Sequence, residues 1–296
     1  MTSSKKQDTI QGYLFISPWL LGLILLQIGP MLLSLYMSLN IWDLFRPPTF
    51  VGLGNYKSLF QDELFWTSLA NSAIYVAGRV PLVLLLSLFV AMLLNQRIPF
   101  RNFLRTAYYL PSVTPQIAML MLWIMLFEPD WGLINWSLGL IGIDPGPRWL
   151  ASLKWAKPAL ILVSAWGIGG TMVIFLAGLQ GVPKQLYEAA ELDGANTLKK
   201  MWHVTLPMIS PVIFFNLVMS VISSFQMFTK AFVMTAGGPG YATLMYVLYL
   251  YNQAFMWFKM GYGSAMAWVL FALLFGFTVI MFKRSAWVYY ESKAQR

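Results

Sequence analysis

The stretch "YEAAELDGANTLKKMWHVTLP", Tyr187–Pro207, decides the fold because it is a polar segment between two long apolar ones. Its first half carries three acidic residues, a glycine stands near its middle, and a proline closes it. Charge-free runs lie on both sides, over Pro158–Pro183 and Val204–Thr229. Each run exceeds the roughly 20 residues that a helix needs to cross a bilayer. The pattern predicts a membrane protein that holds a polar, helix-forming segment between two of its spans.

The composition of the whole chain agrees with a membrane protein. Of its 296 residues, 58% are hydrophobic and only 10% are charged, and the mean hydropathy is +0.64. Soluble domains carry about a quarter charged residues. Four further apolar segments are long enough to cross, and only one of them is interrupted, by Arg79. They are Thr9–Trp42, Leu64–Gln96, Thr106–Phe127 and Met260–Phe282.

These six segments predict an all-α membrane protein with six transmembrane helices. The spans are expected at about 12–40, 68–94, 106–127, 158–180, 206–229 and 261–282, within one transmembrane domain over 12–284. The polar loop covers 183–207, and two tails cover 1–11 and 285–296. Lys5 and Lys6 precede an apolar run, as in a signal peptide, but the run is too long and lacks a small-residue cleavage site. We expect this run to be the retained first span.

Lysine and arginine predict the orientation, because short cytoplasmic loops carry more of them than outer loops do. The connection "NQRIPFRNFLR" after the second span holds three arginines and no acidic residue. With the N-terminus inside, more of the basic residues fall on the inner side than on the outer side. Both tails and the loop 183–207 are therefore expected to face the cell interior.

Two other apolar stretches are expected to lie outside the membrane. Ala231–Phe258 is charge-free, but it opens with "TAGGPGYAT", whose glycines and proline break a helix. Its remainder is short and rich in tyrosine, which suits an interfacial or protein-covered helix. The stretch "WGLINWSLGLIGI" at 131–143 is too short to cross. A seventh span at 231–258 is the alternative, and it would move the C-terminal tail outside.

The spans lack the groups that ion-coupled carriers and enzymes use. All eleven acidic residues and His203 lie outside them, whereas ion-coupled carriers hold such residues near the midplane. No His/Asp/Glu cluster has metal-ligand spacing, no cysteine is present, and no phosphate-binding G-x-x-x-x-G-K-[ST] motif occurs. The sequence therefore disfavours a channel, an ion-coupled carrier and a membrane enzyme. It also lacks the basic soluble domain that nucleic-acid binding needs.

The polar loop is predicted to form two short helices joined by a sharp turn. Pro183 suits a first helical turn, and "KQLYEAAELD" consists largely of good helix formers. Gly194 fits a left-handed C-terminal cap, and Asn196 or Thr197 can cap the next helix. The first helix combines alanines, which allow close approach, with carboxylates that can bind an arginine. These features are typical of a docking element rather than of a solvent loop.

At these residues the chain resembles the permease subunits of binding-protein-dependent ABC importers. The resemblance consists of "EAA", three residues, "G", nine residues and "VTLP", where Val204 replaces a commoner isoleucine and Trp202 a frequent phenylalanine. The later "TAGGPGYAT…YNQAF…GYGSAMAW" is similar to the sugar-permease branch, whose members pair with a second permease. The match extends over nearly the whole chain from the first span onward.

The resemblance implies a type I importer permease fold and a division of tasks among subunits. Two homologous permeases would form the pathway in a bacterial or archaeal cytoplasmic membrane, and an extracytoplasmic sugar-binding protein would deliver the cargo. Two ATP-binding subunits would hydrolyse ATP with Mg²⁺, so that this chain itself would be no enzyme and hold no cofactor. The loop would dock on them, with Glu188 bonded to a basic residue and Gly194 setting the angle. The coupling residues implied are Glu188, Ala189, Ala190, Asp193, Gly194, Leu206 and Pro207.

The resemblance also places a sugar site near the midplane, on the spans that flank the loop. Hydroxyl groups, bare glycine backbone and an aromatic plate suit a sugar, but small residues also serve ordinary helix packing in membranes. Both interpretations stay open. The residues selected are Ser164, Trp166, Gly167, Gly170, Ser220, Ser223 and Met227, with Thr171, Asn216, Ser224 and Gln226 as secondary candidates.

Arg79 is the one charged residue inside a span, and Pro81 follows closely. It either reaches toward the interface or pairs with carbonyls that the proline frees, or it lines a water-filled cavity and contacts substrate. The expected cargo is a mono- or oligosaccharide, and a polyol or a phosphorylated or acidic sugar is the alternative in which Arg79 matters more. The outer segment 237–258 would meet the binding protein or anchor the chain at the interface.

Overall fold

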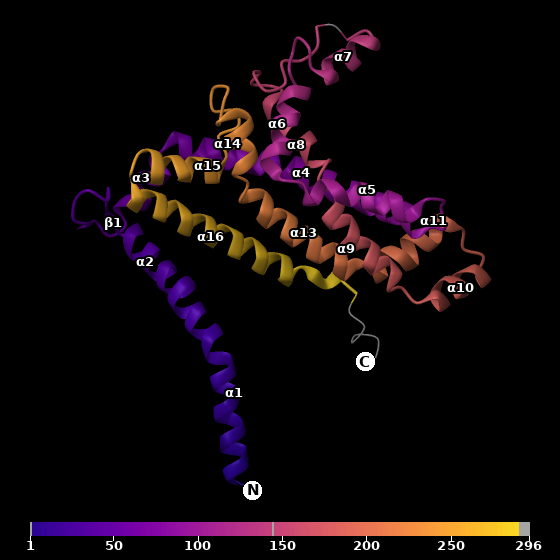
Figure 1. The fold of residues 1–296 in the computed structure, drawn as a ribbon, viewed down its shortest axis with the longest axis horizontal. Coiled ribbons are helices and arrows are strands. Elements are labelled where there is room, and N and C mark those ends of the chain that lie inside the picture. The colour runs from indigo at the N-terminus through magenta and orange to yellow at the C-terminus, as the bar shows by residue number, and fades with distance from the viewer. Residues whose placement is uncertain (1, 144, 290–296) are drawn as a thin grey trace. The chain divides into compact units, whose positions relative to one another are not determined.

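The chain is helical over most of its length in the computed structural model, which describes residues 2–143 and 145–289 (Figure 1). It divides into two compact units. The first consists of Met1–Asp62 and Leu250–Leu273, and the second of Glu63–Tyr249 and Leu274–Arg296. The loop 183–207, Arg79 and every residue selected for the substrate site lie in the second unit.

The first unit begins with a long apolar helical segment. It consists of α1 (Thr2–Leu23), a π-helical turn η1 (Ile24–Ile28) and α2 (Gly29–Ser38). The apolar part, Gln11–Ser38, has 28 residues and a mean hydropathy of 2.0, and its most apolar window is not buried by the rest of the described chain. An apolar surface of this size requires lipid or another subunit around it.

A small hairpin and a short helix follow in the first unit. β1 (Asn40–Ile41) pairs antiparallel with β2 (Thr49–Phe50), with Asn40 opposite Phe50. In α3 (Gly54–Gln61), the Asn55 amide donates to the carbonyls of Ser38 (2.8 Å) and Asn40 (2.9 Å). Because the last carbonyls of a helix have no partner within it, Asn55 satisfies acceptors left at the end of α2.

The long helix α16 (Met260–Lys283) starts against this hairpin. The N–H of Met260 donates to the Trp42 carbonyl (3.0 Å), and the Trp268 indole N–H donates to Ser34 Oγ (3.0 Å). A Cβ at Gly261 would overlap the backbone carbonyl of Asn40, so this close approach requires glycine.

α4 (Glu63–Asn95) is the central helix of the second unit. It packs against α8 (Ala156–Ser164), α9 (Gly169–Gln180) and α13 (Ser210–Phe225). A hydrophobic core lies between α4 and α9, where Ala91, Met172 and Phe175 are fully buried. After a short 3-10 turn η4 (Ser285–Trp287), the Tyr289 N–H donates to Ser210 Oγ (2.8 Å), which ties the described C-terminal end to α13.

Three pairs of helices in this unit are bent rather than straight. α5 (Arg101–Val113) meets α6 (Gln116–Leu126) at 97°, α8 meets α9 at 44°, and the segment Thr197–Met208 meets α13 at 66°. The first break falls before α6 at Pro115, which supplies no backbone N–H. The second falls in the "WGIGGT" run at 166–171, whose three glycines allow the backbone to bend. The sharp first bend has no counterpart among the expectations from the sequence.

By length and composition, three helices can each cross a membrane, namely Gln11–Ser38, Glu63–Asn95 and Met260–Lys283. If each bent pair makes one crossing, the described residues provide six. α15 (Tyr246–Tyr251) with the π-helical turn η3 (Asn252–Met256), and α7 (Leu133–Leu140), are too short to cross. No seventh span is therefore found at 231–258.

The segment after α14 (Thr229–Thr235) folds back onto α4 within the second unit. The Asn71 amide donates to the carbonyls of Tyr241 (2.8 Å) and Leu244 (3.1 Å), and the Tyr246 N–H donates to Ser72 Oγ (2.8 Å). Residues 242–246 are buried. These five residues are therefore protein-covered, whereas Tyr241 and residues 255–258 of the suggested docking segment are exposed.

Candidate functional site

The loop 183–207 forms two helices around a left-handed turn. α10 (Lys184–Leu192) starts directly after Pro183 and ends before Gly194, whose φ of +74° glycine adopts without steric cost. The N–H of Gly194 donates to the Glu191 carbonyl (3.0 Å), and the N–H of Ala195 donates to the Ala190 carbonyl (2.9 Å). These two bonds make a Schellman motif, which stops α10 and turns the chain sharply.

The second helix of the loop is capped as the sequence predicts. The Asn196 side chain accepts from the N–H of Lys199 (2.9 Å) at the start of α11 (Thr197–Lys200). A π-helical turn η2 (Met201–Thr205) and α12 (Leu206–Met208) lead on to α13. The Lys200 ammonium also binds the Glu191 carboxylate (2.7 Å), which links the second helix to the first across the turn.

The predicted docking face of α10 is open to its surroundings. Glu188, Ala189, Asp193 and Gly194 are exposed, and Ala190 is half-buried. The same loop exposes large apolar side chains, since Leu192 is 91% and Leu198 60% exposed. Acidic groups beside exposed leucines form a surface that suits a protein partner.

The loop is also fastened to the helices below it. The hydroxyl groups of Tyr187 and Thr205 share a hydrogen bond of 3.0 Å, which joins α10 to the start of the segment that leads into α13. Tyr187, Val204 and Leu206 pack against the α4–α9 core, and Pro207 lies half-buried beside Leu206. A displacement of α10 would therefore be transmitted to the apolar helices.

Arg79 lies at the midpoint of the 33-residue α4. Its Nη1 donates to the Ser220 carbonyl (3.3 Å), to Ser223 Oγ (3.4 Å) and to Ser224 Oγ, all on α13. The structure thus joins Arg79 to serines that the sequence selected independently. All the hydrogen bonds described for Arg79 are made to α13. They therefore do not show the pairing with α4 carbonyls freed by Pro81, which was one of the interpretations left open.

A second cation lies beside this group. Lys230 of α14 donates from Nζ to Ser164 Oγ (2.8 Å) and to the Tyr75 hydroxyl (3.4 Å), which itself lies 3.1 Å from Ser164 Oγ. Burial, and secondly the charge of Arg79, lower the pKa of Lys230 to about 7. Tyr75 precedes Arg79 by one helical turn on α4, so the two cations occupy neighbouring positions along one face.

The selected glycines do not serve close helix packing. Apart from the adjoining backbone, no heavy atom of the described residues lies within 4 Å of the place where a Cβ would stand at Gly167 or Gly170. Between them, Gly169 lies against the Tyr108 carbonyl and Ser112 Oγ, so it is Gly169 that allows α9 to approach α5. Packing of small residues thus explains Gly169 but neither of the two candidates.

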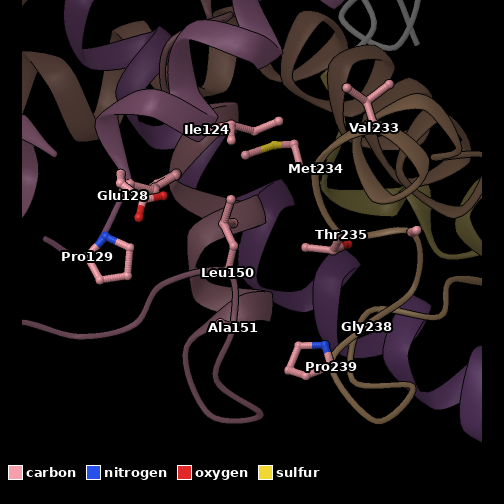
Figure 2. Close-up of a pocket in the computed structure, with 12 residues that line it drawn as sticks. Ile124, Glu128, Pro129, Leu150, Ala151, Val233, Met234, Thr235, Gly238 and Pro239 are labelled. Carbon is pink, nitrogen blue, oxygen red and sulfur yellow. The ribbon is translucent and has the colours of Figure 1, made fainter. Parts of the chain in front are cut away.

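A cavity of ≈ 530 Å³ opens beside the C-terminal end of α6 (Figure 2). Figure 2 shows Glu128 and Pro129 on one side of it, Thr235, Gly238 and Pro239 on the other, and Leu150 between them. None of its lining residues belongs to the Arg79 or Lys230 clusters. With the predicted orientation, this cavity lies on the outer side.

Known proteins identify the family to which these features belong. Residues 83–286 match the family described as "Binding-protein-dependent transport system inner membrane component". The chain is also 43% identical over 297 residues to the probable ABC transporter permease protein YesP of Bacillus subtilis (strain 168), covering 99% of this chain and 96% of that protein. The chain belongs to this permease family.

Two further similarities concern a named cargo and a solved structure. The permease is 36% identical to the arabinooligosaccharides transport system permease protein AraP of Halalkalibacterium halodurans, over 89% of this chain and 84% of that protein. It also matches a chain of a bacterial alginate ABC transporter, crystallised with an alginate pentasaccharide-bound periplasmic protein, with a TM-score of 0.84, 97% of each chain covered and 20% identity. At that identity the likeness concerns the fold, which is the type I importer permease fold predicted from the sequence.

The structure brings together part of the predicted substrate set of the permease. Ser164 joins Lys230, and Ser220 and Ser223 join Arg79. Trp166 is instead 54% exposed and lies edge-to-face against Trp123 of α6 (6.1 Å). Within 2–143 and 145–289, no described hydrogen bond or ring contact links Trp166, Gly167, Gly170 or Met227 to the two cations.

The sequence did not identify Lys230 and Tyr75 as site residues. Lys230 directly follows the apolar run Val204–Thr229, so the sequence gives no sign that it returns to a helix of another span. Tyr75 could have been found from the sequence, since it lies four residues before Arg79 and therefore on the same helical face. Among the secondary candidates, Ser224 contacts Arg79, whereas the Asn216 amide binds the Val212 carbonyl of its own helix (2.9 Å).

Proposed function

We propose that this permease is the transmembrane subunit of an ATP-driven importer that moves a carbohydrate across the cytoplasmic membrane. Family membership supports the importer, and the relative named for arabinooligosaccharides supports a carbohydrate. The observation that carries the proposal is the loop 183–207, in which an exposed short helix is held at a set angle and fastened to the apolar core.

The loop would transmit force from a separate ATP-hydrolysing subunit. Glu188 would bind a basic residue of that partner by a charge-assisted hydrogen bond, while Ala189 and Ala190 would allow close approach. Gly194 would keep α10 at its angle, and the Tyr187–Thr205 hydrogen bond would pass the motion on to α13. ATP and Mg²⁺ would be bound by the partner.

A second permease would complete the pathway. The unburied apolar window of Gln11–Ser38 and the open surface at Gly167 and Gly170 would face lipid or that companion. A binding protein would deliver the sugar on the outer side, where the cavity at Glu128 and Thr235 offers a recess for a docking loop. The N-terminus, the C-terminal tail and the coupling loop would face the cytoplasm.

The first test measures the energy source. Uptake of a labelled oligosaccharide into vesicles that hold the complete transporter should require ATP and all partner chains, and it should persist after ionophores collapse the ion gradients. Uptake by this chain alone against a concentration gradient, or loss of uptake with the gradients, would show a carrier of another class.

The second test addresses the coupling helix. Glu188→Lys should abolish uptake and leave ATP hydrolysis uncoupled from cargo, while the amount of permease in the membrane stays unchanged. Glu191→Gln is the matched control, because Glu191 lies on the same helix but pairs with Lys200 inside the loop. Equal and full uptake by both variants would contradict the proposed role of Glu188.

A further inference from the structure

Arg79 leaves one edge of its guanidinium group unused. Its three contacts to α13 are all made by Nη1. Among the described residues, the Nε and Nη2 atoms of Arg79 have no hydrogen-bond partner, and neither atom is enclosed by the protein. The Nε–Nη2 edge is suited to bind a carboxylate through two parallel hydrogen bonds. The serines therefore hold Arg79 by one nitrogen and leave this binding edge open.

Lys230, like Arg79, has unused donor capacity and contacts only neutral groups among the described residues. Its ammonium group meets two neutral hydroxyl groups, of Ser164 and Tyr75, although it can donate three hydrogen bonds. Hydroxyl groups accept hydrogen bonds but do not neutralise a charge. The ion pairs within the described part of the chain join Arg46 to Asp43 and Lys200 to Glu191, so neither Arg79 nor Lys230 has a carboxylate partner there.

A third cation extends the pattern along α4. Asn71, Tyr75 and Arg79 follow at intervals of four residues, so they lie on one face of the helix, about 6 Å apart along its axis. Lys157 donates from Nζ to Asn71 Oδ1 (2.8 Å), Lys230 binds Tyr75, and Arg79 is the third. We call Lys157, Lys230 and Arg79 the cation row. It ends at the midpoint of α4.

A row of like charges without counter-charge is unfavourable in a low-dielectric environment. Burial, and secondly the charge of Arg79, accordingly lower the pKa of Lys230 to about 7, and a bound anion would favour its protonated form. Charged side chains inside membrane proteins are costly, and those that occur face a cavity or a partner and mark substrate paths. A neutral sugar could bond the serines but would leave the charges uncompensated. An anion would both compensate the positive charges and bind the unused N–H donors, because it brings opposite charge and acceptor atoms together.

We propose that the cargo of this importer is an oligosaccharide that bears anionic groups, and that the cation row binds these groups as the cargo passes. This inference rests on the proposed function of carbohydrate import. Carboxylate, phosphate and sulfonate groups share the chemistry that the row recognises, namely a sugar-borne oxyanion. Lys157 and Lys230 would meet it first with the predicted orientation, and Arg79 would hold it at the membrane midplane.

The test compares permease variants within the complete transporter, since the binding protein also selects cargo. Uptake is measured for an oligogalacturonate, for a neutral galacto-oligosaccharide of the same length, and for a sugar phosphate. Arg79→Gln and Lys230→Gln should each lower uptake of the anionic cargo by at least about tenfold, which corresponds to loss of one charge-assisted hydrogen bond. Arg79→Lys and Lys230→Arg, which keep the charge, should retain most of the uptake. Arg46→Gln, at an exposed arginine outside the row, is the control for a general loss of charge.

The outcomes separate this inference from the proposed function. ATP-dependent uptake of neutral sugars only, or equal losses for neutral and anionic cargo in the glutamine variants, would overturn the anionic cargo and leave the importer intact. Of the two anionic sugars tested, the one that gives the larger difference between variants shows whether the row prefers a carboxylate or a phosphate.

A second readout does not depend on transport. The chain has no cysteine, so Ser223→Cys supplies a single thiol beside Arg79. Digalacturonate should slow its modification by a thiol reagent, and the neutral disaccharide should not. Equal protection by both sugars, or protection by neither, would contradict anion binding at Arg79 even if no sugar were taken up.

Discussion

The turn at Gly194 provides a direct measure of how much the angle of the coupling helix matters. Its φ of +74° is unfavourable for residues with a Cβ, by roughly 1–2 kcal/mol. No heavy atom lies within 4 Å of the position of a Cβ there, so a substitution meets only the backbone cost and no clash. Since 1.4 kcal/mol is a factor of ten, Gly194→Val should reduce the population of the observed turn by about 5- to 30-fold. Gly194→Asn should reduce it much less, because asparagine tolerates this conformation.

The assay is the number of sugar molecules taken up per ATP hydrolysed by the complete transporter in vesicles. We expect the ratio to fall in the order glycine, asparagine, alanine, valine, at equal amounts of permease. Gly181→Ala is the control, because Gly181 follows α9 with φ −79°, which any residue adopts. An unchanged ratio in Gly194→Val would show that the left-handed turn does not set the coupling angle.

Three further substitutions test the packing and charges of the fold. Gly169→Val should overlap the Tyr108 backbone and destabilise the permease by about 1–3 kcal/mol, whereas Gly170→Val should be tolerated. Equal thermal stability of the two variants in detergent would contradict the assigned packing. Asn55→Ala should lower the free energy of unfolding by about 1–3 kcal/mol, because it leaves buried carbonyls without a donor. Lys57→Ala should leave it unchanged in the same thermal melting experiment. Lys200→Ala should cost less than about 1 kcal/mol because its ion pair is at the surface, so a large loss of stability or uptake would show a role beyond the loop.

The local features of the loop could be predicted because each depends on neighbouring residues alone. A glycine after a helix-forming run adopts the left-handed cap, and an asparagine three residues before an N–H caps the next helix. Gly194 and Asn196 both do so here. The apolar segments were likewise visible, because length and absence of charge are properties of a single stretch of chain.

The cation row could not be predicted, because it depends on contacts between distant parts of the chain. Arg79 and Ser220 are 141 positions apart, and Tyr75 and Lys230 are 155 apart. Lys230 reaches Tyr75 only because α14 returns to α4, which its sequence does not indicate. The burial of residues 242–246 has the same cause, since Asn71 and Ser72 supply the donors and acceptors that the irregular backbone there requires.

The central claim is that the loop 183–207 faces the cell interior and binds the subunit that hydrolyses ATP. Because the chain has no cysteine, Ala189→Cys places a single thiol on the exposed face of α10. This thiol should cross-link to a cysteine in the ATP-hydrolysing partner, and a membrane-impermeant thiol reagent should leave it unlabelled in intact cells. Labelling of Ala189→Cys from outside intact cells, with no cross-link to that partner, would contradict it.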